Sequence, residues 1–256
     1  MRPNTSSPSR PALRTTLGVI ALAMPLALAG CGSDDSSTDE TAAAGSTTSA
    51  SSDSGSASDS AADSSSAEGD SAASTAECPP AEGASERTDS FDSAPPMCLT
   101  PGADYSAVIT TDAGEVTVDL LEEAAPETVN NFVFLARNKF YEGVSFHRVI
   151  PGFMIQGGDP QGTGMGGPGY EFADELPEPG AYEIGSMAMA NAGPDTNGSQ
   201  FFIVTGDAGV SLPPQYSLFG QVTEGMETVT AIEDDGSAQG APSTTHTIES
   251  VEIVEQ

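Results

Sequence analysis

The sequence predicts a mainly β fold, a closed antiparallel barrel with two helices. Two observations lead to this prediction. Eight short runs rich in β-branched and aromatic residues follow one another between residues 105 and 254, and Gly- and Pro-rich turns separate most of them. Only two segments show the spacing of apolar residues that is typical of a helix. Because the connections are short, one barrel of about 150 residues with a single core fits this pattern.

The expected elements begin at residue 105. The runs 105–111 and 115–120 flank Asp112-Ala113-Gly114, which predicts a β-hairpin. Pro126 suits a first helical turn, and apolar residues then recur every three or four positions, so we expect a helix over 126–138. Further strands are expected at 144–149, 154–157, 186–190, 201–205, 218–222 and 247–254, with a second helix over 226–232.

The first 30 residues have the order of a signal peptide. Three arginines and no acidic residue precede an apolar run from Leu17 to Leu28, and Ala29-Gly30-Cys31 follows. The run is shorter than the roughly 20 residues of a membrane-spanning helix, so an uncleaved span is the weaker alternative. Leu-Ala-Gly-Cys resembles the bacterial lipobox, which implies that Cys31 is lipidated and becomes the mature N-terminus. Ordinary secretion, with Cys31 incidental, is the alternative.

Residues 31–77, which begin with the lipidated cysteine, are predicted to be a disordered tether. From residue 32 they consist mostly of Ser, Ala, Thr, Gly and Asp and contain no aromatic residue, so they cannot bury enough surface to offset chain entropy. The segment 78–103 follows, bounded on one side by Cys78 and containing Cys98. In an oxidising compartment an even pair predicts a disulfide, with free buried thiols as the alternative.

The charge is strongly acidic. The chain has 38 acidic and 7 basic residues and a net charge of −31, which becomes −34 once the three arginines of residues 1–30 are removed. Such a surface repels phosphate backbones and anionic lipid headgroups, so we expect no nucleic-acid partner. A link to the membrane would have to be the lipid on Cys31, and an extracytoplasmic, lipid-anchored location is expected.

Three segments carry the clearest chemical pattern: FHRVIPGFMIQGGD at 146–159, MANAGPDTNGSQFF at 189–202 and LPPQYSLFG at 212–220. In order and spacing they resemble the signature segments of the cyclophilins, peptidyl-prolyl cis-trans isomerases, and the resemblance extends over about 104–256. It implies a closed eight-stranded antiparallel barrel capped by two helices, with a proline-binding groove on its outer face. It also implies proline-containing segments as substrates, and the predicted signal peptide adds that these belong to exported proteins.

The resemblance also implies the site residues. Arg148 is the expected catalytic donor, because a permanently charged guanidinium can hydrogen-bond the prolyl nitrogen once amide conjugation is lost. The remaining expected residues bind substrate, as a proline pocket or as a peptide-binding surface: Phe153, Met154, Gln156, Ala190, Asn191, Gln200, Phe202, Leu212 and Tyr216. Tyr216 stands where the family often has histidine.

Each of these residues has a plainer interpretation. Arg148 could form a surface salt bridge, and the apolar residues could belong to the core. His147 is expected to be packed or hydrogen-bonded rather than a general base, since isomerisation removes no proton, and His246 is expected to be structural. The glycines of 162–167 satisfy GxGxxG, but no helix pattern follows, so we expect a loop beside the groove. No metal-ligand spacing is present, and we expect no cofactor and a monomer.

A different class of function stays open on these grounds. The tether and the acidity would equally serve a surface module that holds Pro-containing segments without turning them over. Comparing the wild type with Arg148→Ala in an isomerase assay separates the two hypotheses.

Overall fold

The computed structural model describes residues 76–256. The predicted signal peptide, the lipidation site Cys31 and nearly all of the predicted tether therefore lie outside the described residues. Within residues 76–256, no helix combines the length and the apolar character that crossing a bilayer requires.

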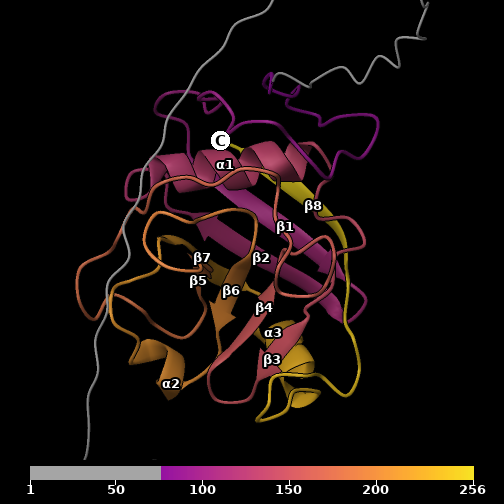
Figure 1. Cartoon of the computed structure of the whole chain (residues 1–256), viewed down its shortest axis with the longest axis vertical. Helices are drawn as coiled ribbons and strands as arrows, with labels where there is room; N and C mark the ends of the chain where they lie inside the picture. The colour runs from indigo at the N-terminus through magenta and orange to yellow at the C-terminus, as the bar shows by residue number, and fades with distance from the viewer. Residues whose placement is uncertain (1–75) are drawn as a thin grey trace, which may run out of the picture. The chain divides into compact units, whose positions relative to one another are not determined.

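One antiparallel sheet of eight strands forms the framework (Figure 1). Its spatial order is β3-β4-β6-β5-β7-β2-β1-β8. The predicted hairpin is confirmed, since Thr111 pairs with Gly114 at the end of the β1–β2 ladder. The strands are β1 Tyr105–Thr111, β2 Gly114–Leu120, β3 Arg148–Ile150, β4 Met154–Gly157, β5 Ser186–Met189, β6 Phe201–Val204, β7 Leu218–Glu224 and β8 Ile248–Glu255.

Two longer helices, α1 (Pro126–Arg137) and α3 (Met226–Asp234), lie at opposite ends of the curled sheet. A residue distant in the sequence caps the first turn of α1. The carboxylate of Glu175 accepts the backbone N–H groups of Glu127 and Thr128 at 3.0 and 2.8 Å. A third helix, α2 (Asp207–Val210), was not predicted. With four residues it is too short to show a helical period in the sequence.

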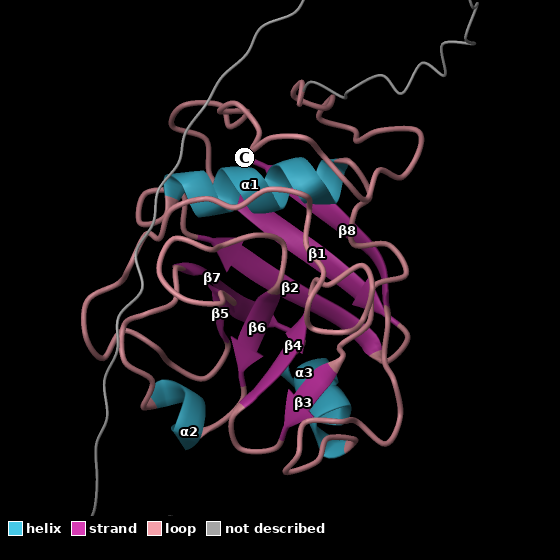
Figure 2. Cartoon of the chain, in the orientation of Figure 1, coloured by secondary structure: helices cyan, strands magenta, loops and turns pink. Residues whose placement is uncertain are grey.

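The prediction of a closed barrel is wrong. The edge strands β3 and β8 do not pair with each other, so the sheet is an open, curled half-barrel. Loop backbone occupies the gap between them: the N–H of Phe146 donates to the carbonyl of His246 at 3.0 Å, and that of Val149 to the carbonyl of Gly240 at 2.8 Å. Figure 2 shows the long loop that joins α3 to β8 and passes beside β3.

The predicted strand at 144–149 is accordingly shorter and displaced. Only Arg148–Ile150 is strand, and upstream of it Ser145 makes an isolated bridge with Thr247. The physical reason is local, because the N–H of Val144 donates to the carbonyl of Tyr141 in a turn, at 3.1 Å. The segment bonds to the start of β8 only at single positions, for example through the carbonyl of Val144, which accepts the N–H of Ile248 at 2.8 Å.

Alternation along the strands separates two apolar clusters. In β6, Phe201 and Ile203 point into the main core, whereas Phe202 and Val204 belong to a second cluster on the outer face. In β5, Ala188 likewise faces the second cluster while its two neighbours face the core. The main core is centred on Phe132 of α1, whose ring packs against several aromatic rings: Tyr141, Phe201 and Phe219.

The segment 78–103 lies against α1 and is closed by a disulfide between Cys78 and Cys98. Its anchor is Phe91, which is buried and packs edge-on against Phe134 at 4.8 Å between ring centroids. The N–H of Phe91 also donates to the carbonyl of Pro168 at 2.7 Å. The segment therefore connects α1 with the Gly-rich loop at 162–169.

Candidate active site

The candidate site lies on the outer face of β3, β4 and β6. Strand register aligns its central residues, since Arg148 pairs with Gln156 and Gln156 pairs with Phe202. Met154 precedes Gln156 by two residues and so shares its face of the sheet. Three neighbouring strands thus present a cation, an amide and two apolar side chains side by side.

Arg148 is held by its neighbours without being neutralised. Its Nη1 donates to Oε1 of Gln156 at 3.0 Å, and its guanidinium lies over the ring of Phe153 at 5.7 Å from the centroid. Among residues 76–256, no carboxylate lies within 4.0 Å of it, whereas Arg137 pairs with Glu255 at 3.0 Å. The salt-bridge interpretation of Arg148 is therefore wrong, and the exposed guanidinium retains donors for a ligand.

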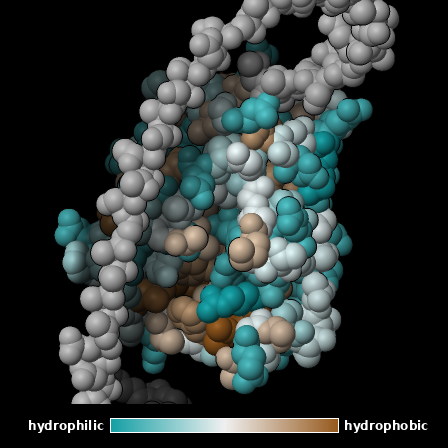
Figure 3. Space-filling model, viewed as in Figure 1, coloured by the Kyte–Doolittle hydropathy of each residue, from teal (hydrophilic) through white to brown (hydrophobic). Residues whose placement is uncertain are grey.

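Beside Arg148 lies a cleft of about 500 Å³. Met154 and Phe202 are buried at its base, and the ring of Tyr216 packs edge-on against Phe202 at 5.3 Å. Tyr182 holds Tyr216 in place, because its hydroxyl donates to the carbonyl of Tyr216 at 2.7 Å. In Figure 3, hydrophobic surface gathers low on the face beside a strongly hydrophilic group, over the region between α2 and β3.

Nine of the ten predicted site residues line this cleft: Arg148, Phe153, Met154, Gln156, Ala190, Asn191, Phe202, Leu212 and Tyr216. The tenth, Gln200, lines a neighbouring cleft of about 620 Å³, which shares Gln156, Ala190 and Asn191 with the first. The two clefts are joined by amides, since Nε2 of Gln156 donates to Oε1 of Gln200 at 3.0 Å. Met154 and Phe202 are buried and also line the cleft. They can therefore belong to the apolar packing of the domain and contact a bound ligand at the same time.

The Gly-rich loop separates the two clefts, as expected for glycines beside a groove. Gly164 lines both of them, and no helix follows the loop. Asp159 organises this loop: its Oδ2 accepts the N–H groups of Thr163 and Gly164 at 2.8 and 2.6 Å. Burial opposes the charge of Asp159, but these backbone donors outweigh it and hold its pKa below the usual value.

His147 also lines the first cleft. Both of its ring nitrogens are buried and have no hydrogen-bond partner within the described residues. Burial lowers the pKa of His147, and the nearby Asp159 carboxylate only partly opposes that shift. The side chain is packed, as expected, and no side chain of residues 76–256 is hydrogen-bonded to it.

Sequence reasoning missed one wall of the cleft, formed by Gln239, Gly240 and Ala241 in the loop between α3 and β8, and also the contribution of Thr163. The one sequence signal for this wall was the glycine at position 240. The structure explains it, because φ is +91° there, a value that favours glycine. Within residues 76–256, no group of three or more His, Cys, Asp or Glu side chains is placed to hold a metal ion. The cleft can take a small apolar ring and donate hydrogen bonds to the amide attached to it.

Three comparisons with known proteins agree with this geometry. Residues 106–253 match the family model described as cyclophilin type peptidyl-prolyl cis-trans isomerase. A peptidyl-prolyl cis-trans isomerase A of Mycobacterium tuberculosis is 42% identical over 175 residues, covering 60% of this chain and 94% of that protein. A putative isomerase of Staphylococcus saprophyticus is 40% identical over 185 residues, with the same coverage.

Solved structures show the same likeness. A cyclophilin type isomerase of Cryptosporidium parvum superposes with a TM-score of 0.54 at 34% identity, covering 60% of this chain and 99% of that one. Another structure of the same protein, determined in the presence of the dipeptide Ala-Pro, has a TM-score of 0.54 at 36% identity and covers 59% and 99% of the two chains.

Proposed function

Because the chain belongs to the cyclophilin-type peptidyl-prolyl cis-trans isomerases and shares their activity, we propose that it turns X–Pro bonds of exported proteins, with Arg148 stabilising the twisted amide. The observation that carries the mechanism is Arg148 itself. It is an exposed guanidinium without a carboxylate partner in the described part of the chain, and it stands at the rim of an apolar cleft.

The reaction requires rotation about a partial double bond. The uncatalysed barrier is about 18–20 kcal/mol, because rotation breaks the resonance between the prolyl nitrogen and the carbonyl. At the top of the barrier, the nitrogen lone pair is no longer conjugated and can accept a hydrogen bond. A donor fixed at that point stabilises the transition state more than the ground state, which is the condition for catalysis.

The cleft supplies the other requirements. Met154, Phe202 and Leu212 form an apolar socket of a size suited to a proline ring, so the ring is held while the chain before it rotates. The amide side chains of Gln156 and Asn191 at its edge can hold the backbone of the substrate. Asn191 is itself oriented, because its Nδ2 donates to the carbonyl of Gln215 at 2.9 Å.

Arg148→Ala tests this mechanism. Removing a single preorganised donor typically lowers kcat by about 10²- to 10³-fold, and we expect a loss of this order in kcat/KM, measured by a protease-free assay on an Ala-Pro peptide. Arg148→Lys should recover little, because an ammonium lacks the planar fork of donors. Arg87→Ala, which removes an arginine from an exposed pair with Asp89, is the matched control and should retain activity. Equal activity in Arg148→Ala would overturn the mechanism.

The proposal of exported substrates and a lipid anchor depends on the N-terminal sequence. It is supported by the disulfide between Cys78 and Cys98, since such bonds persist in oxidising compartments. Two or more acyl chains on Cys31 would hold the protein stably on a membrane. Membrane fractionation with mass spectrometry of the mature N-terminus tests this. We expect a lipid-modified Cys31 in the membrane fraction and a soluble protein for Cys31→Ala, whereas an unmodified N-terminus would contradict the proposal.

A further inference from the structure

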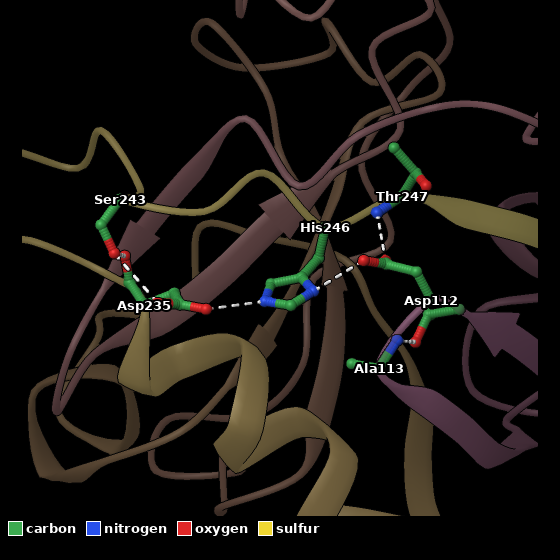
Figure 4. A network of polar contacts seen from close by, with 7 residues as sticks. Asp112, Ala113, Asp235, Ser243, His246 and Thr247 are labelled. Atoms are coloured by element: carbon green, nitrogen blue, oxygen red, sulfur yellow. Dashed lines mark hydrogen bonds and ion pairs between the residues drawn. The ribbon is translucent and has the colours of Figure 1, made fainter.

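A histidine outside the three family segments bridges two carboxylates. Nδ1 of His246 lies 3.0 Å from Oδ2 of Asp112, and its Nε2 lies 3.0 Å from Oδ2 of Asp235 (Figure 4). The side chain of His246 is only 13% exposed. Because a neutral imidazole carries one N–H, only the doubly protonated ring can donate to both carboxylates at once. We call these three residues the clasp.

Both carboxylates of the clasp are fixed by other bonds. Oδ1 of Asp112, in the β1–β2 turn, accepts the N–H of Thr247 at 2.7 Å. Asp235, at the end of α3, accepts the hydroxyl of Ser243 on Oδ1 at 3.0 Å. The hydrogen bond from His246 is the main cause that lowers the pKa of Asp235, with that from Ser243 second. The clasp therefore ties three places in the fold: a hairpin turn, a helix end and the start of β8.

The clasp closes the base of one loop. Residues 236–245, here called the gap loop, run from α3 to β8, and Asp235 and His246 stand directly before and after it. In Figure 1 the gap loop forms part of the yellow segment between these two elements. The gap loop lies in the opening of the half-barrel, where the ladder between β3 and β8 is missing.

The gap loop also packs on the stem of Arg148. The backbone at Gly240 is so close that an added Cβ would lie 3.1 Å from Cγ of Arg148. The carbonyl of Gly240 accepts the N–H of Val149 at 2.8 Å, and the N–H of Ser237 donates to the carbonyl of Val149 at 3.1 Å. The loop therefore limits where the guanidinium can stand.

We propose that His246 is a positioning residue for catalysis: by bridging Asp112 and Asp235 it holds the gap loop against Arg148 and so fixes the catalytic guanidinium. This inference rests on the proposed role of Arg148. In the proline socket, Met154 and Phe202 stand on strands and Leu212 follows α2, so the socket is built from other elements than the clasp. Loss of the clasp should therefore lower kcat and leave KM nearly unchanged.

The test compares four proteins: wild type, His246→Asn, Arg148→Ala and the double variant. Since small displacements of a catalytic group lower rates by up to about 100-fold, we expect His246→Asn to lower kcat by about 3- to 10-fold and to change KM by less than about 2-fold. In the Arg148→Ala background the same substitution should have no further effect. His246→Arg, whose guanidinium can donate to both carboxylates, should keep kcat.

A matched control and a second measurement separate positioning from stability. Glu255→Gln breaks an ion pair of the same length, with Arg137, and should leave kcat unchanged. In His246→Asn, amide hydrogen exchange should speed up at Val149 and Ser237. Should His246→Asn fail to fold, Asp112→Asn takes its place, with the same kinetic and exchange results expected.

Three results would overturn the inference: an unchanged kcat, a loss that simply adds to that of Arg148→Ala, or unchanged exchange at Val149 and Ser237. The proposed function fails differently, through an Arg148→Ala variant as active as wild type. In that case the exchange measurement still decides whether the clasp holds the gap loop.

Discussion

The two walls of the catalytic cleft are built in different ways. Arg148, Gln156 and Phe202 stand on paired strands, so the hydrogen-bonded register of β3, β4 and β6 sets their spacing. The opposite wall at 239–241 is loop backbone, attached to β3 by a few hydrogen bonds and, at its base, by the clasp. In the proposed function the first wall supplies the side chains that contact the substrate, and the second restricts how one of them can move.

The two walls should therefore respond differently to substitution. A ladder of strands is cooperative, so residues placed on it change position only when the sheet does. The gap loop has no such ladder, and its position depends on individual bonds. Apart from Arg148, we therefore expect substitutions in the strand wall to affect binding and stability strongly, and those in the loop wall to affect mainly the rate.

The largest of these effects is expected for Phe202→Ala in the strand wall. Removing a buried Phe side chain costs about 3–5 kcal/mol of unfolding free energy, and Phe202 is 4% exposed. Loss of the socket should also raise KM by about tenfold or more, which corresponds to about 1.4 kcal/mol of binding.

Chemical unfolding and steady-state kinetics measure these two effects of Phe202→Ala. Phe134→Ala is the control, since Phe134 is equally buried but packs on Phe91 away from the cleft. An equal rise of KM in both variants would show that the socket has no special role.

A smaller effect is expected for Gly240→Ala in the loop wall. A methyl group there would lie 3.1 Å from Cγ of Arg148, and the φ of +91° strains any residue but glycine. We expect kcat to fall by about 3- to 10-fold through displacement of the guanidinium. Gly102→Ala is the matched control: its φ is +79° and nothing lies within 4 Å, so it carries the backbone strain alone. Similar losses in both variants would argue against contact with Arg148.

The smallest effect is expected for Asp159→Asn, which should lower stability by an amount that depends on pH. The pKa of Asp159 is lower in the folded state, so its contribution to stability is present above the ordinary aspartate pKa and is lost as the pH falls through the folded value. At neutral pH we expect Asp159→Asn to lower Tm by about 3 °C or more. The difference from wild type should shrink in strong acid; a difference independent of pH would contradict this account.

Much of this arrangement could be predicted from local sequence patterns. The bounds of β1 and β4 were predicted correctly, because their alternation and flanking turns lie within a few residues. The resemblance of the three segments identified nine residues that meet in one cleft. The lengths of β3 and of α2 could not be predicted, since turns and single bridges decide them.

The clasp could not be predicted from local sequence patterns, for a different reason. His246 was expected to be structural, and nothing in its neighbourhood in the sequence pointed to a partner. Asp112 is 134 residues away and Asp235 is 11 residues away. The open edge of the sheet was missed in the same way, because whether β3 and β8 meet depends on the loops that lie between them.

Arg148, which has no carboxylate partner among residues 76–256, has a consequence for how substrates arrive. The chain carries 38 acidic residues, and no lysine or arginine follows Arg148. A peptide therefore approaches a negative surface in which the guanidinium of Arg148 is a local exception. The summed field of such a surface speeds the encounter with basic peptides and slows it with acidic ones. Salt screens charges beyond about 8 Å at physiological ionic strength. The preference among substrates therefore depends on the medium outside the domain as well as on the cleft.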